Sequence, residues 1–453
     1  MDNWDKIFKT YDVRGVYPRE INEEVAYKIG RAVAKFLKNK EIAIGQDNRL
    51  SSEGLFKSLC AGVCDGGADV IDVGLVTTPM LYWVVARYGY KGGIMVTASH
   101  NSAEYNGFKI VKEKSIPIDE DSGLKKIKKI VAKGKFKDKK RGKITKKDVF
   151  LDYIENIFRF IDINSIKPLK TVVDTGNGAA GLIVPEIFKR VPAKLIHIFA
   201  ELDGAYPNHN PNPVLPENTA ALQKKVVSEK ADCGIAFDGD GDRILFVDEK
   251  GERINPNFIF TLLIDRFFRN KGKIVYDVSA SRIVREEIKK SGNTTLCTRV
   301  GYSFLKEKMS KLNVVFGGES SGHYYLGEDY YIESPFFVLF KILEIISKEG
   351  KPLSELIKPF DKYYLERINF KIKENPDKIL KELEKKYKKD PARLGRPGKV
   401  SLFDGLTIEH SDWWFNIRIS NTEPVLRLTI EADTKELLEE KKQELLKLIP
   451  SSL

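Results

Sequence analysis

Short apolar runs, separated by stretches in which apolar residues recur with helical spacing, follow one another from residue 42 to residue 316. In each of three segments, two such runs are followed by a third run that ends in a polar loop. Continuous apolar runs of this length are typical of parallel strands buried on both faces of a sheet. We therefore predict nine strands in three similar α/β units: Ile42–Gly45, Asp69–Val73 and Gly93–Val96; Thr171–Asp174, Lys194–Phe199 and Asp232–Phe237; Lys273–Asp277, Thr294–Arg299 and Asn313–Phe316.

The last part of the chain follows a different pattern, in which two helices alternate with short strands. The helices are predicted at Asp377–Lys388 and Lys435–Leu448, and the strands at Thr407–Glu409, Trp414–Ile419 and Val425–Glu431. This alternation indicates a smaller α+β domain. The expected fold is α/β: three similar mixed-sheet domains and a C-terminal α+β domain around a central cleft. Their expected bounds are residues 1–147, 148–250, 251–361 and 362–453.

The third run of each α/β unit ends in a loop rich in glycine and polar side chains. These loops are Thr97–Asn101, Asp238–Arg243 and Gly317–His323. Open α/β sheets bind their ligands at the carboxyl ends of their strands. We therefore expect the loops to converge, together with one from the last domain, on the central cleft.

The composition excludes several classes of protein. A hydrophobic fraction of 42% and an aromatic fraction of 10% over 453 residues indicate a globular chain and not a disordered or fibrous one. No apolar run approaches the roughly 18 residues of a membrane helix, and no secretion signal is visible at the N-terminus. Four cysteines cannot form a disulfide framework, and Cys60 and Cys64 lack the further ligands of a zinc site. A cytoplasmic location is expected.

The net charge of +12 comes almost entirely from one segment. Residues 124–148 contain 13 Lys or Arg and 2 Asp, a net charge of +11, so the rest of the chain carries about +1. A basic segment with few aromatic residues favours a solvated helix and linker over a nucleic-acid groove. We expect no nucleic-acid, membrane or obligate protein partner, although the charge could weakly attract anionic substrates.

Three aspartates at alternate positions give the most specific local signal. Asp238, Asp240 and Asp242 follow a predicted strand, and carboxylates so spaced can converge on one hard divalent cation. An EF-hand is disfavoured because Arg243 stands where that loop needs glycine, although Glu249 falls at its twelfth position. We predict Mg²⁺ beside a phosphate, with Arg243 contacting a phosphoryl oxygen. A simple acidic surface turn is the competing interpretation.

Two further loops are open to more than one interpretation. Ser99, with His100 beside it, could be a nucleophile or a helix cap, and no Gly-x-Ser-x-Gly elbow surrounds it. The run Gly176–Gly181 meets the formal conditions of a dinucleotide fingerprint, including Glu201 about 20 residues on. Tight strand-to-helix turns also invite glycines, so we favour close helix–sheet packing there over NAD binding.

A fourth loop, in the C-terminal domain, has the composition of a phosphate-binding site. Arg418–Pro424 and Arg427 supply two guanidinium groups, two hydroxyls and an amide within ten residues. A solvated turn beside an incidentally basic strand is the alternative. A carboxylate triad, a hydroxyl that could carry a phosphoryl group and a separate phosphate site together predict phosphoryl transfer on a phosphorylated substrate. Glu319, Ser321 and His323 would then bind a polyol or sugar.

These loops resemble those of the α-D-phosphohexomutase superfamily, and the resemblance extends along essentially the whole chain. It is strongest to the bacterial phosphomannomutase/phosphoglucomutase branch. In that family a phosphorylated serine coordinates Mg²⁺ with three aspartates and donates its phosphoryl group to the sugar. The bisphosphorylated intermediate then reorients and returns its other phosphate. The matching segments occur in the family's order: Tyr11–Gly15, Thr97–Asn101, Asp238–Arg243, Gly317–His323 and Arg418–Pro424.

The resemblance implies a role for each matching residue. Ser99 would be the phosphoserine and a metal ligand, together with Asp238, Asp240 and Asp242. Proton transfer and charge neutralisation would involve Arg14, Lys109, Arg243 and His323. A lysine near such a phosphoserine could have its pKa moved towards neutrality. The expected substrate-binding residues are Tyr11, His100, Glu319, Ser321, His323, Arg418, Ser420, Asn421, Thr422 and Arg427.

The resemblance also bears on the substrate. Ala205–Pro213 is similar to a loop of the hexose-directed enzymes, which favours mannose and glucose phosphates, with a hexose 1,6-bisphosphate of glucose or mannose as activator. Two positions depart from the family's pattern. Ser102 replaces a proline, which could loosen the serine loop, and Tyr302 stands where relatives commonly have histidine. The alternatives are a phosphoglucosamine mutase and a catalytically silent phosphosugar-binding protein.

Overall fold

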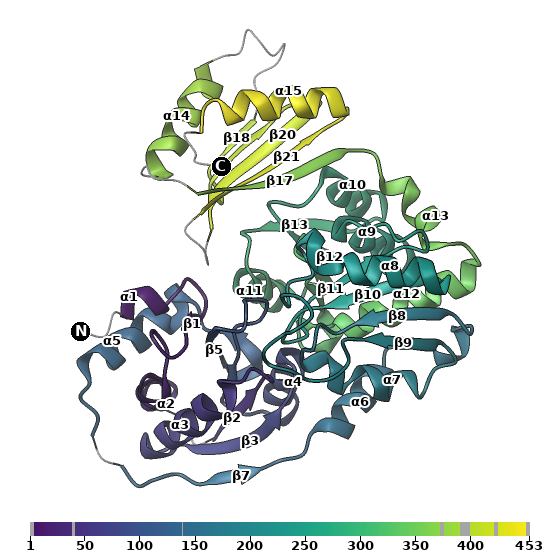
Figure 1. Cartoon of the computed structure of the whole chain (residues 1–453). Helices are drawn as coiled ribbons and strands as arrows, with labels where there is room; N and C mark the ends of the chain where they lie inside the picture. The colour runs from purple at the N-terminus through teal and green to yellow at the C-terminus, as the bar shows by residue number, and fades with distance from the viewer. Residues whose placement is uncertain are drawn as a thin grey trace.

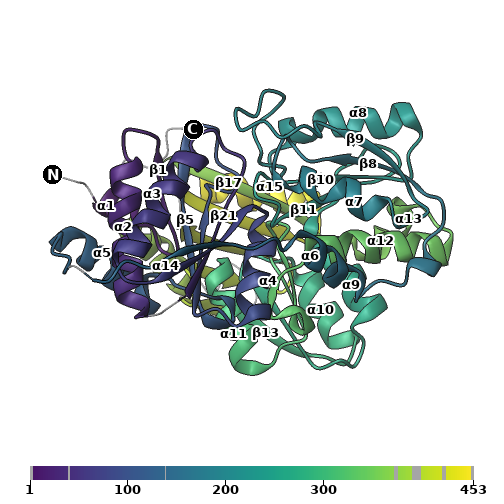
Figure 2. The same cartoon turned by 90° about the horizontal axis from the view of Figure 1, so that it is seen from below.

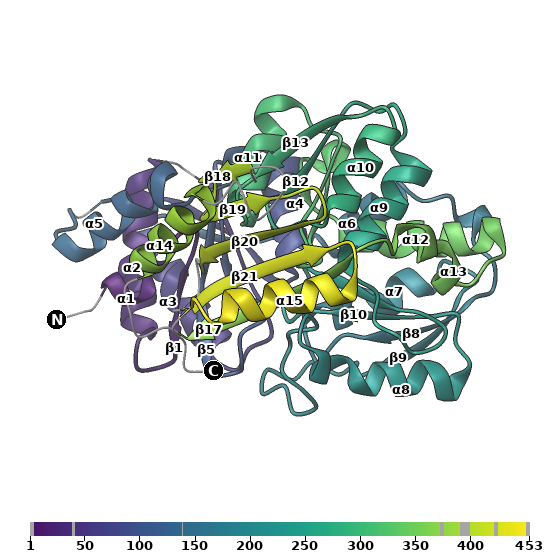
Figure 3. The same ribbon diagram turned by 90° about the horizontal axis from the view of Figure 1, so that it is seen from above.

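Four sheets follow one another along the chain in the computed structural model, which describes residues 4–38, 41–137, 139–371, 376–389, 399–420 and 425–449. The first three sheets carry helices on their faces, and the fourth lies apart from them (Figure 1). In the view from above, the C-terminal sheet lies over the junction between the first domain and the two that follow it (Figure 3). The expected fold class, three mixed α/β domains and a C-terminal α+β domain, is confirmed. Among the described helices, none has the length and apolar character needed to cross a bilayer.

The first domain contains a sheet in the order β1-β5-β4-β2-β3-β7, with β6 beside β5. Strands β2, β3 and β4 are parallel, as the apolar runs predicted, whereas β5 runs antiparallel to β4 and β1. Its elements are α1 (Trp4–Ile7), β1 (Val13–Val16), α2 (Glu23–Leu37), β2 (Glu41–Gln46), α3 (Ser52–Asp65), β3 (Asp69–Leu75), α4 (Thr78–Tyr88), β4 (Gly92–Val96), β5 (Tyr105–Lys112), β6 (Ile116–Pro117), α5 (Lys125–Lys133) and β7 (Ile144–Lys146).

The basic segment is partly anchored to this sheet. It begins with α5, a helix that buries Ile127 and Val131 and exposes most of its lysines, as expected of a solvated helix. The segment then returns along the domain, and β7 pairs in parallel with β3 at the sheet edge. The linker to the second domain therefore includes an edge strand, which the sequence pattern did not predict because its three residues are all exposed.

The second domain has the sheet order β11-β10-β8-β9. Strands β8, β9 and β10 are parallel, and β11 returns antiparallel to β10, so that the aspartate loop connects the two strands of a hairpin. The elements are α6 (Phe150–Phe158), β8 (Lys170–Asp174), α7 (Val184–Phe188), β9 (Lys194–Ile198), α8 (Ala220–Glu229), β10 (Cys233–Phe237) and β11 (Ile244–Val247).

The third domain has the order β13-β12-β14-β15-β16, and its polar loop again lies in a hairpin, between β14 and β15. The predicted strand Asn313–Phe316 is wrong: Asn313 adopts a left-handed conformation (φ 52°) that ends α11, and the strand begins only at Phe316. The elements are α9 (Pro256–Phe267), β12 (Lys273–Asp277), α10 (Arg282–Lys290), β13 (Thr294–Thr298), α11 (Tyr302–Leu312), β14 (Phe316–Gly318), β15 (Tyr324–Leu326), β16 (Ile332–Glu333), α12 (Pro335–Glu349) and α13 (Leu353–Ile357).

The C-terminal sheet is antiparallel throughout, in the order β17-β21-β20-β19-β18. Helices α14 and α15 lie on the face directed away from the other domains (Figure 1). The elements are β17 (Tyr364–Lys371), α14 (Pro376–Lys389), β18 (Lys399–Ser401), β19 (Leu406–Glu409), β20 (Trp413–Ile419), β21 (Val425–Ala432) and α15 (Lys435–Leu446).

The buried cores show how the domains are joined. Leu81 of the first domain, Phe237 of the second and Phe336 of the third belong to one continuous apolar cluster. The C-terminal domain has a separate core, which includes Phe370 and Phe415. Seen from below, the C-terminal strands lie behind the first domain and the start of the second (Figure 2). The first three domains are therefore united by the hydrophobic effect, whereas the fourth depends more on polar contacts.

Arg282, at the start of α10, provides a main polar contact to the C-terminal domain. Its Nε lies 2.9 Å from Glu431 Oε1, its Nη1 donates to the Ser411 carbonyl at 3.1 Å, and its Nη2 contacts Asp433. The indole of Trp414 donates to the same Glu431 oxygen at 2.8 Å. Glu431 is fully buried, so its charge depends on these donors.

We expect Arg282→Met to destabilise the docking of the C-terminal domain by about 3 kcal/mol, because a buried carboxylate loses its cation. The control Arg285→Met removes a partly exposed pair with Glu409 and should cost about 0–1 kcal/mol. Urea unfolding followed by tryptophan fluorescence checks this, since Trp413 and Trp414 lie in the C-terminal domain. Equal shifts in the two variants would contradict the assignment.

Candidate active site

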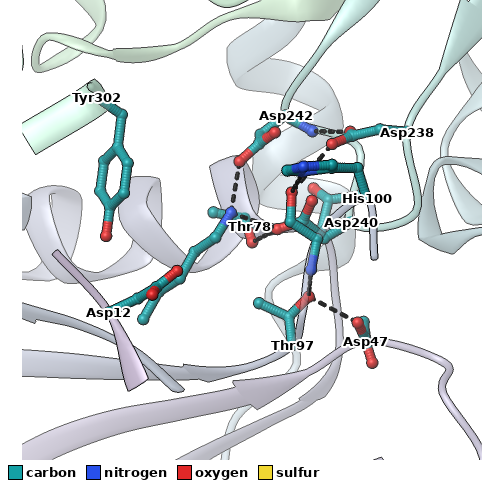
Figure 4. A network of polar contacts seen from close by, with 12 residues as sticks. Asp12, Asp47, Thr78, Thr97, His100, Asp238, Asp240, Asp242 and Tyr302 are labelled. Carbon is teal, nitrogen blue, oxygen red and sulfur yellow. Dashed lines mark hydrogen bonds and ion pairs between the residues drawn. The ribbon is translucent and has the colours of Figure 1, made fainter. Parts of the chain in front are cut away.

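The serine loop holds Ser99 in a strained conformation. Ser99 has a left-handed backbone (φ 52°), which is uncommon and costly for a residue with a side chain. Its amide donates to Thr97 Oγ1 at 2.8 Å, and that hydroxyl donates to Asp47 Oδ2 at 2.6 Å (Figure 4). The loop after β2 therefore fixes the loop after β4, and the strain is maintained by buried hydrogen bonds.

Arg49 fixes the same loop through its carbonyl groups. Its Nη2 donates to the carbonyls of Ser99 and Asn101 at 2.7 and 2.6 Å, and its Nη1 to those of Ser102 and Tyr105 at 2.7 and 3.0 Å. The side chain is fully buried and is paired with Asp47. Sequence reasoning missed Arg49 and Asp47, although a polar Asp-Asn-Arg run directly after a predicted strand was the available signal. With Ser102 in place of proline, the loop is held by Arg49.

The three predicted metal-binding aspartates converge at the loop between β10 and β11. All three are buried, and one carboxylate oxygen from each lies within 4.8 Å of the others. Asp238 Oδ1 closes the loop by accepting from the amides of Asp242 and Arg243 at 3.0 and 3.1 Å. Asp238 Oδ2 accepts from Ser99 Oγ at 3.1 Å. Figure 4 shows the aspartates of the second domain directed at the serine loop of the first.

Lys109, on β5, lies against two of these carboxylates. Its Nζ is 2.6 Å from Asp240 Oδ2 and 2.6 Å from Asp242 Oδ2. Burial alone would lower the pKa of Lys109, but the two carboxylates outweigh burial and raise it above its ordinary value. Two buried anions thus hold the charge of Lys109 in place. The expectation that its pKa moves towards neutrality concerns a lysine beside a magnesium-bound phosphoserine, and it stays a prediction.

The carboxylates of the aspartate loop suit a hard divalent cation. Asp240 Oδ1 is buried and has no hydrogen-bond partner among the described residues, although Thr78 Oγ1 and Lys109 occupy Oδ2 of the same carboxylate. Burial and the charges of Asp242 and Asp240 raise the pKa of Asp238. Three carboxylates within 4.8 Å of one another, one of them with a buried oxygen that accepts no hydrogen bond from the described residues, are the ligands that a hard divalent cation prefers. Thr78 is a further site residue that the sequence did not reveal.

The loop between β14 and β15 brings His323 to the same carboxylates. His323 Nε2 lies 3.0 Å from Asp242 Oδ1, and Nδ1 lies 3.2 Å from Glu319 Oε2 and 2.9 Å from Ser321 Oγ. Burial opposes protonation, but Asp242 and then the hydrogen bonds of both carboxylates raise the pKa of His323 to about 10. Arg243 Nε lies 3.3 Å from His323 Nε2. Because both nitrogens of a protonated imidazole are donors, this contact is not a hydrogen bond.

The N-terminal motif lies beside the serine loop. Arg14, on β1, donates to Asn101 Oδ1 and to Asp12 Oδ2, both at 2.6 Å. His100 is adjacent, with Nδ1 3.4 Å from Ser99 Oγ. Burial, followed by the positive charges of Arg243 and Arg14, lowers the pKa of His100 well below its ordinary value, so the ring is neutral.

Tyr302 packs against Tyr11 at the edge of the site. Its ring lies edge-on to Tyr11, with centroids 5.1 Å apart, and its hydroxyl donates to the Tyr11 carbonyl at 2.9 Å. Lys109 Nζ is 5.8 Å from the Tyr302 ring centroid. Figure 4 shows Tyr302 at the side of the site, near Asp12. Its hydroxyl is thus already bonded within the protein, between the first and third domains.

The predicted phosphate-binding loop lies partly within the described structure. Arg418 and Ser420, at the end of β20, are buried, and Arg418 lies directly opposite Arg427 of β21. Burial lowers the pKa of Arg418, and the adjacent Arg427 lowers it further. Asn421 and Thr422, which the sequence also assigned to this site, lie outside the described residues. Two guanidinium groups side by side on neighbouring strands favour an anion between them.

The glycine-rich run at residue 176 packs against the aspartate loop. A Cβ at Gly178 would lie 2.7 Å from the Gly239 carbonyl oxygen, and the Ala179 amide donates to that oxygen at 2.9 Å. The glycines therefore allow one loop to contact another, in place of the helix–sheet packing that we expected. The amide of Ala179, which would face a dinucleotide pyrophosphate, is used within the protein.

Family models match the chain in four consecutive parts, which describe the four domains of phosphoglucomutase/phosphomannomutase. The first three are α/β/α domains I, II and III, at residues 5–138, 148–251 and 255–363. The fourth is the C-terminal domain of the same family, at residues 368–448.

Curated relatives and a solved structure match over nearly the whole length. The phosphomannomutase of Vibrio cholerae is 38% identical over 98% of both chains. A phosphohexose mutase of Xanthomonas campestris is 36% identical over 98% of both chains. A phosphoglucomutase/phosphomannomutase family protein from Burkholderia thailandensis superposes with a TM-score of 0.88 at 30% identity, over 98% of this chain and 96% of that one. The chain therefore belongs to the α-D-phosphohexomutase superfamily, as a phosphomannomutase-like isomerase.

Proposed function

We propose that the chain interconverts hexose 1-phosphate and hexose 6-phosphate, of mannose and of glucose, through a phosphoserine at Ser99 and a bisphosphorylated sugar intermediate. The observation that supports this most strongly is the position of Ser99 Oγ, 3.1 Å from Asp238 within a buried carboxylate triad. A serine in a strained loop, beside a site suited to a divalent cation, is arranged to hold and transfer a phosphoryl group.

Asp238, Asp240 and Asp242, with the phosphorylated Ser99, are the residues that would hold Mg²⁺. When bound, the ion neutralises charge on the transferring phosphoryl oxygens. Arg243 Nε lies 3.6 Å from Asp238 Oδ2, and the remaining donors of this guanidinium group would contact a phosphoryl oxygen. Lys109 and Arg14 add positive charge beside the serine loop.

Transfer breaks the bond between Ser99 Oγ and phosphorus and forms one to a sugar hydroxyl, which loses its proton to a nearby base. Lys109 and His323 are the candidates for moving that proton. The carboxylates beside them keep both groups protonated, so either must first release its own proton to act as the base, which a cation that neutralises those carboxylates would favour. Glu319 and Ser321 contact sugar hydroxyls, and Arg418, Ser420, Asn421, Thr422 and Arg427 bind the phosphate at the far end. After the bisphosphorylated sugar reorients, the reverse transfer returns a phosphoryl group to Ser99, and free glucose or mannose 1,6-bisphosphate restores enzyme that has lost it.

A phosphomannomutase/phosphoglucomutase activity is supported by the relatives named phosphomannomutase and phosphohexose mutases, at 36–38% identity. The alternatives from the sequence, a phosphoglucosamine mutase and a silent phosphosugar-binding protein, remain to be tested. A coupled assay with Mg²⁺ and trace glucose 1,6-bisphosphate compares mannose 1-phosphate, glucose 1-phosphate and glucosamine 6-phosphate. Turnover of glucosamine 6-phosphate alone would overturn the sugar assignment.

We expect Ser99→Ala to abolish steady turnover of mannose 1-phosphate, because the variant loses the hydroxyl that would carry the phosphoryl group. Binding of the sugar phosphate by calorimetry should persist, since the cleft residues are unchanged. The control Ser165→Ala removes a hydroxyl from an exposed site and should leave turnover unchanged. Near-normal activity of Ser99→Ala would remove Ser99 as the carrier.

Asp240→Asn should weaken Mg²⁺ binding by at least about tenfold, because loss of second-shell partners alone costs about 10–100-fold in affinity and here a ligand charge is lost. Titration of activity against Mg²⁺, with calorimetry as a second readout, measures this. Glu217→Gln, which neutralises an exposed acid of the same domain, is the control. An unchanged metal titration would contradict the triad.

We expect Arg418→Ala to raise KM for both hexose phosphates by about 10–100-fold and to change kcat less, because a charged hydrogen bond to phosphate is present in the ground and transition states alike. Steady-state kinetics in both directions measure the two parameters. A fall in kcat alone would place Arg418 outside the distal phosphate site.

A further inference from the structure

The C-terminal sheet presents a polar face on the side opposite its own apolar core. Every second residue of β21, including Leu426, Leu428 and Ile430, belongs to that core. Because side chains alternate along a strand, the remaining positions of the same strands point the other way. That opposite face bears Glu431, which contacts Arg282 of the third domain, so it is directed at the other domains.

Strand register places a third arginine on this polar face. Arg418 of β20 lies opposite Arg427 of β21, and Arg427 lies opposite Asn369 of β17. Arg367 precedes Asn369 by two residues, so it shares the face and is the diagonal neighbour of Arg427. Three adjacent strands therefore each direct one guanidinium group to the same side, although like charges at such positions repel one another.

The nearby carboxylates do not neutralise Arg367. Asp277 accepts from the amides of Ser279 and Ser320 at 2.7 and 2.9 Å. Glu431 is bonded to Arg282 and Trp414. Across the described residues, no carboxylate oxygen lies within ion-pair distance of this guanidinium.

Arg367 instead contacts two carbonyl groups of the third domain. Its Nη1 donates to the Ser320 carbonyl at 2.8 Å and its Nη2 to that of Ser279 at 3.3 Å. Ser320 lies between Glu319 and Ser321, the residues expected to contact the sugar. Neutral carbonyls position the guanidinium without cancelling its charge, and Arg367 is exposed whereas Arg282 is buried.

We propose that Arg367 is a further substrate-binding residue, the third guanidinium group of the distal phosphate site, which holds the phosphate and the sugar loop together. This inference rests on the proposed function, because it assumes that the anion at Arg418 is the phosphate of the substrate. Arg367 belongs to the C-terminal domain and is bonded to the sugar loop of the third domain. Phosphate bound at Arg367 thus fixes the C-terminal domain relative to Glu319 and Ser321.

The test compares three replacements of Arg367 in the full-length protein. Arg367→Lys retains a positive charge, Arg367→Gln retains a donor for the Ser320 carbonyl but no charge, and Arg367→Met retains neither. The control Lys371→Gln removes one positive charge from an exposed position on the same face of β17. KM and kcat for glucose 1-phosphate, and competitive inhibition by inorganic phosphate, are measured for each variant, with thermal unfolding to verify the fold.

We expect Arg367→Gln and Arg367→Met to raise KM and the inhibition constant of inorganic phosphate by about tenfold or more, with a smaller rise for Arg367→Lys and none for Lys371→Gln. If Arg367→Gln binds both ligands as the parent protein does, Arg367 only connects the two domains and the inference is overturned. Arg418→Ala distinguishes failure of the Arg367 inference from failure of the distal-phosphate assignment. If Arg418→Ala raises KM while the Arg367 variants do not, only the inference on Arg367 fails. If neither Arg418→Ala nor the Arg367 variants change KM, the distal-phosphate assignment fails as well.

Discussion

The concentration of negative charge at the loop between β10 and β11 is the constraint on which the site depends. Three buried carboxylates within 4.8 Å of one another are unfavourable unless cations offset them. The chain supplies Lys109 from the first domain, and His323 from the third lies 3.0 Å from Asp242. Arg243 of the same loop lies 3.6 Å from Asp238, and the other two cations come from the first and third domains, so the charge of one loop is offset by residues of three domains.

Each polar loop lies in a hairpin and not at a simple strand-to-helix turn. Strand β5 returns antiparallel to β4, β11 to β10, and β15 to β14. The returning strand brings further residues back to the same edge of the sheet: Lys109 lies on β5, ten residues after Ser99. A hairpin therefore places a loop and a side chain of the following strand at one site, which a βα turn would not do.

The domains differ in how they are held together. One apolar cluster runs through the first three domains, so their loops are fixed relative to one another. The C-terminal domain has its own core and meets the third domain through Arg282 and Arg367, which bind carboxylates and carbonyls. Polar contacts between separately folded domains are weaker than a shared core, which suits a domain that contributes to substrate binding.

The sequence alone determined the parallel strands, the separate C-terminal domain and the family, because periodicity and loop motifs are local. The strand at Asn313 was misplaced, since a left-handed residue that ends a helix leaves no apolar signal. Arg49, Thr78 and Arg367 were missed as parts of the site, because their partners lie 50 or more residues away or in another domain. The pKa of Lys109 was likewise decided by the fold, which places its ammonium group between two buried carboxylates. Such contacts depend on how separate segments pack, and only the tertiary structure specifies that.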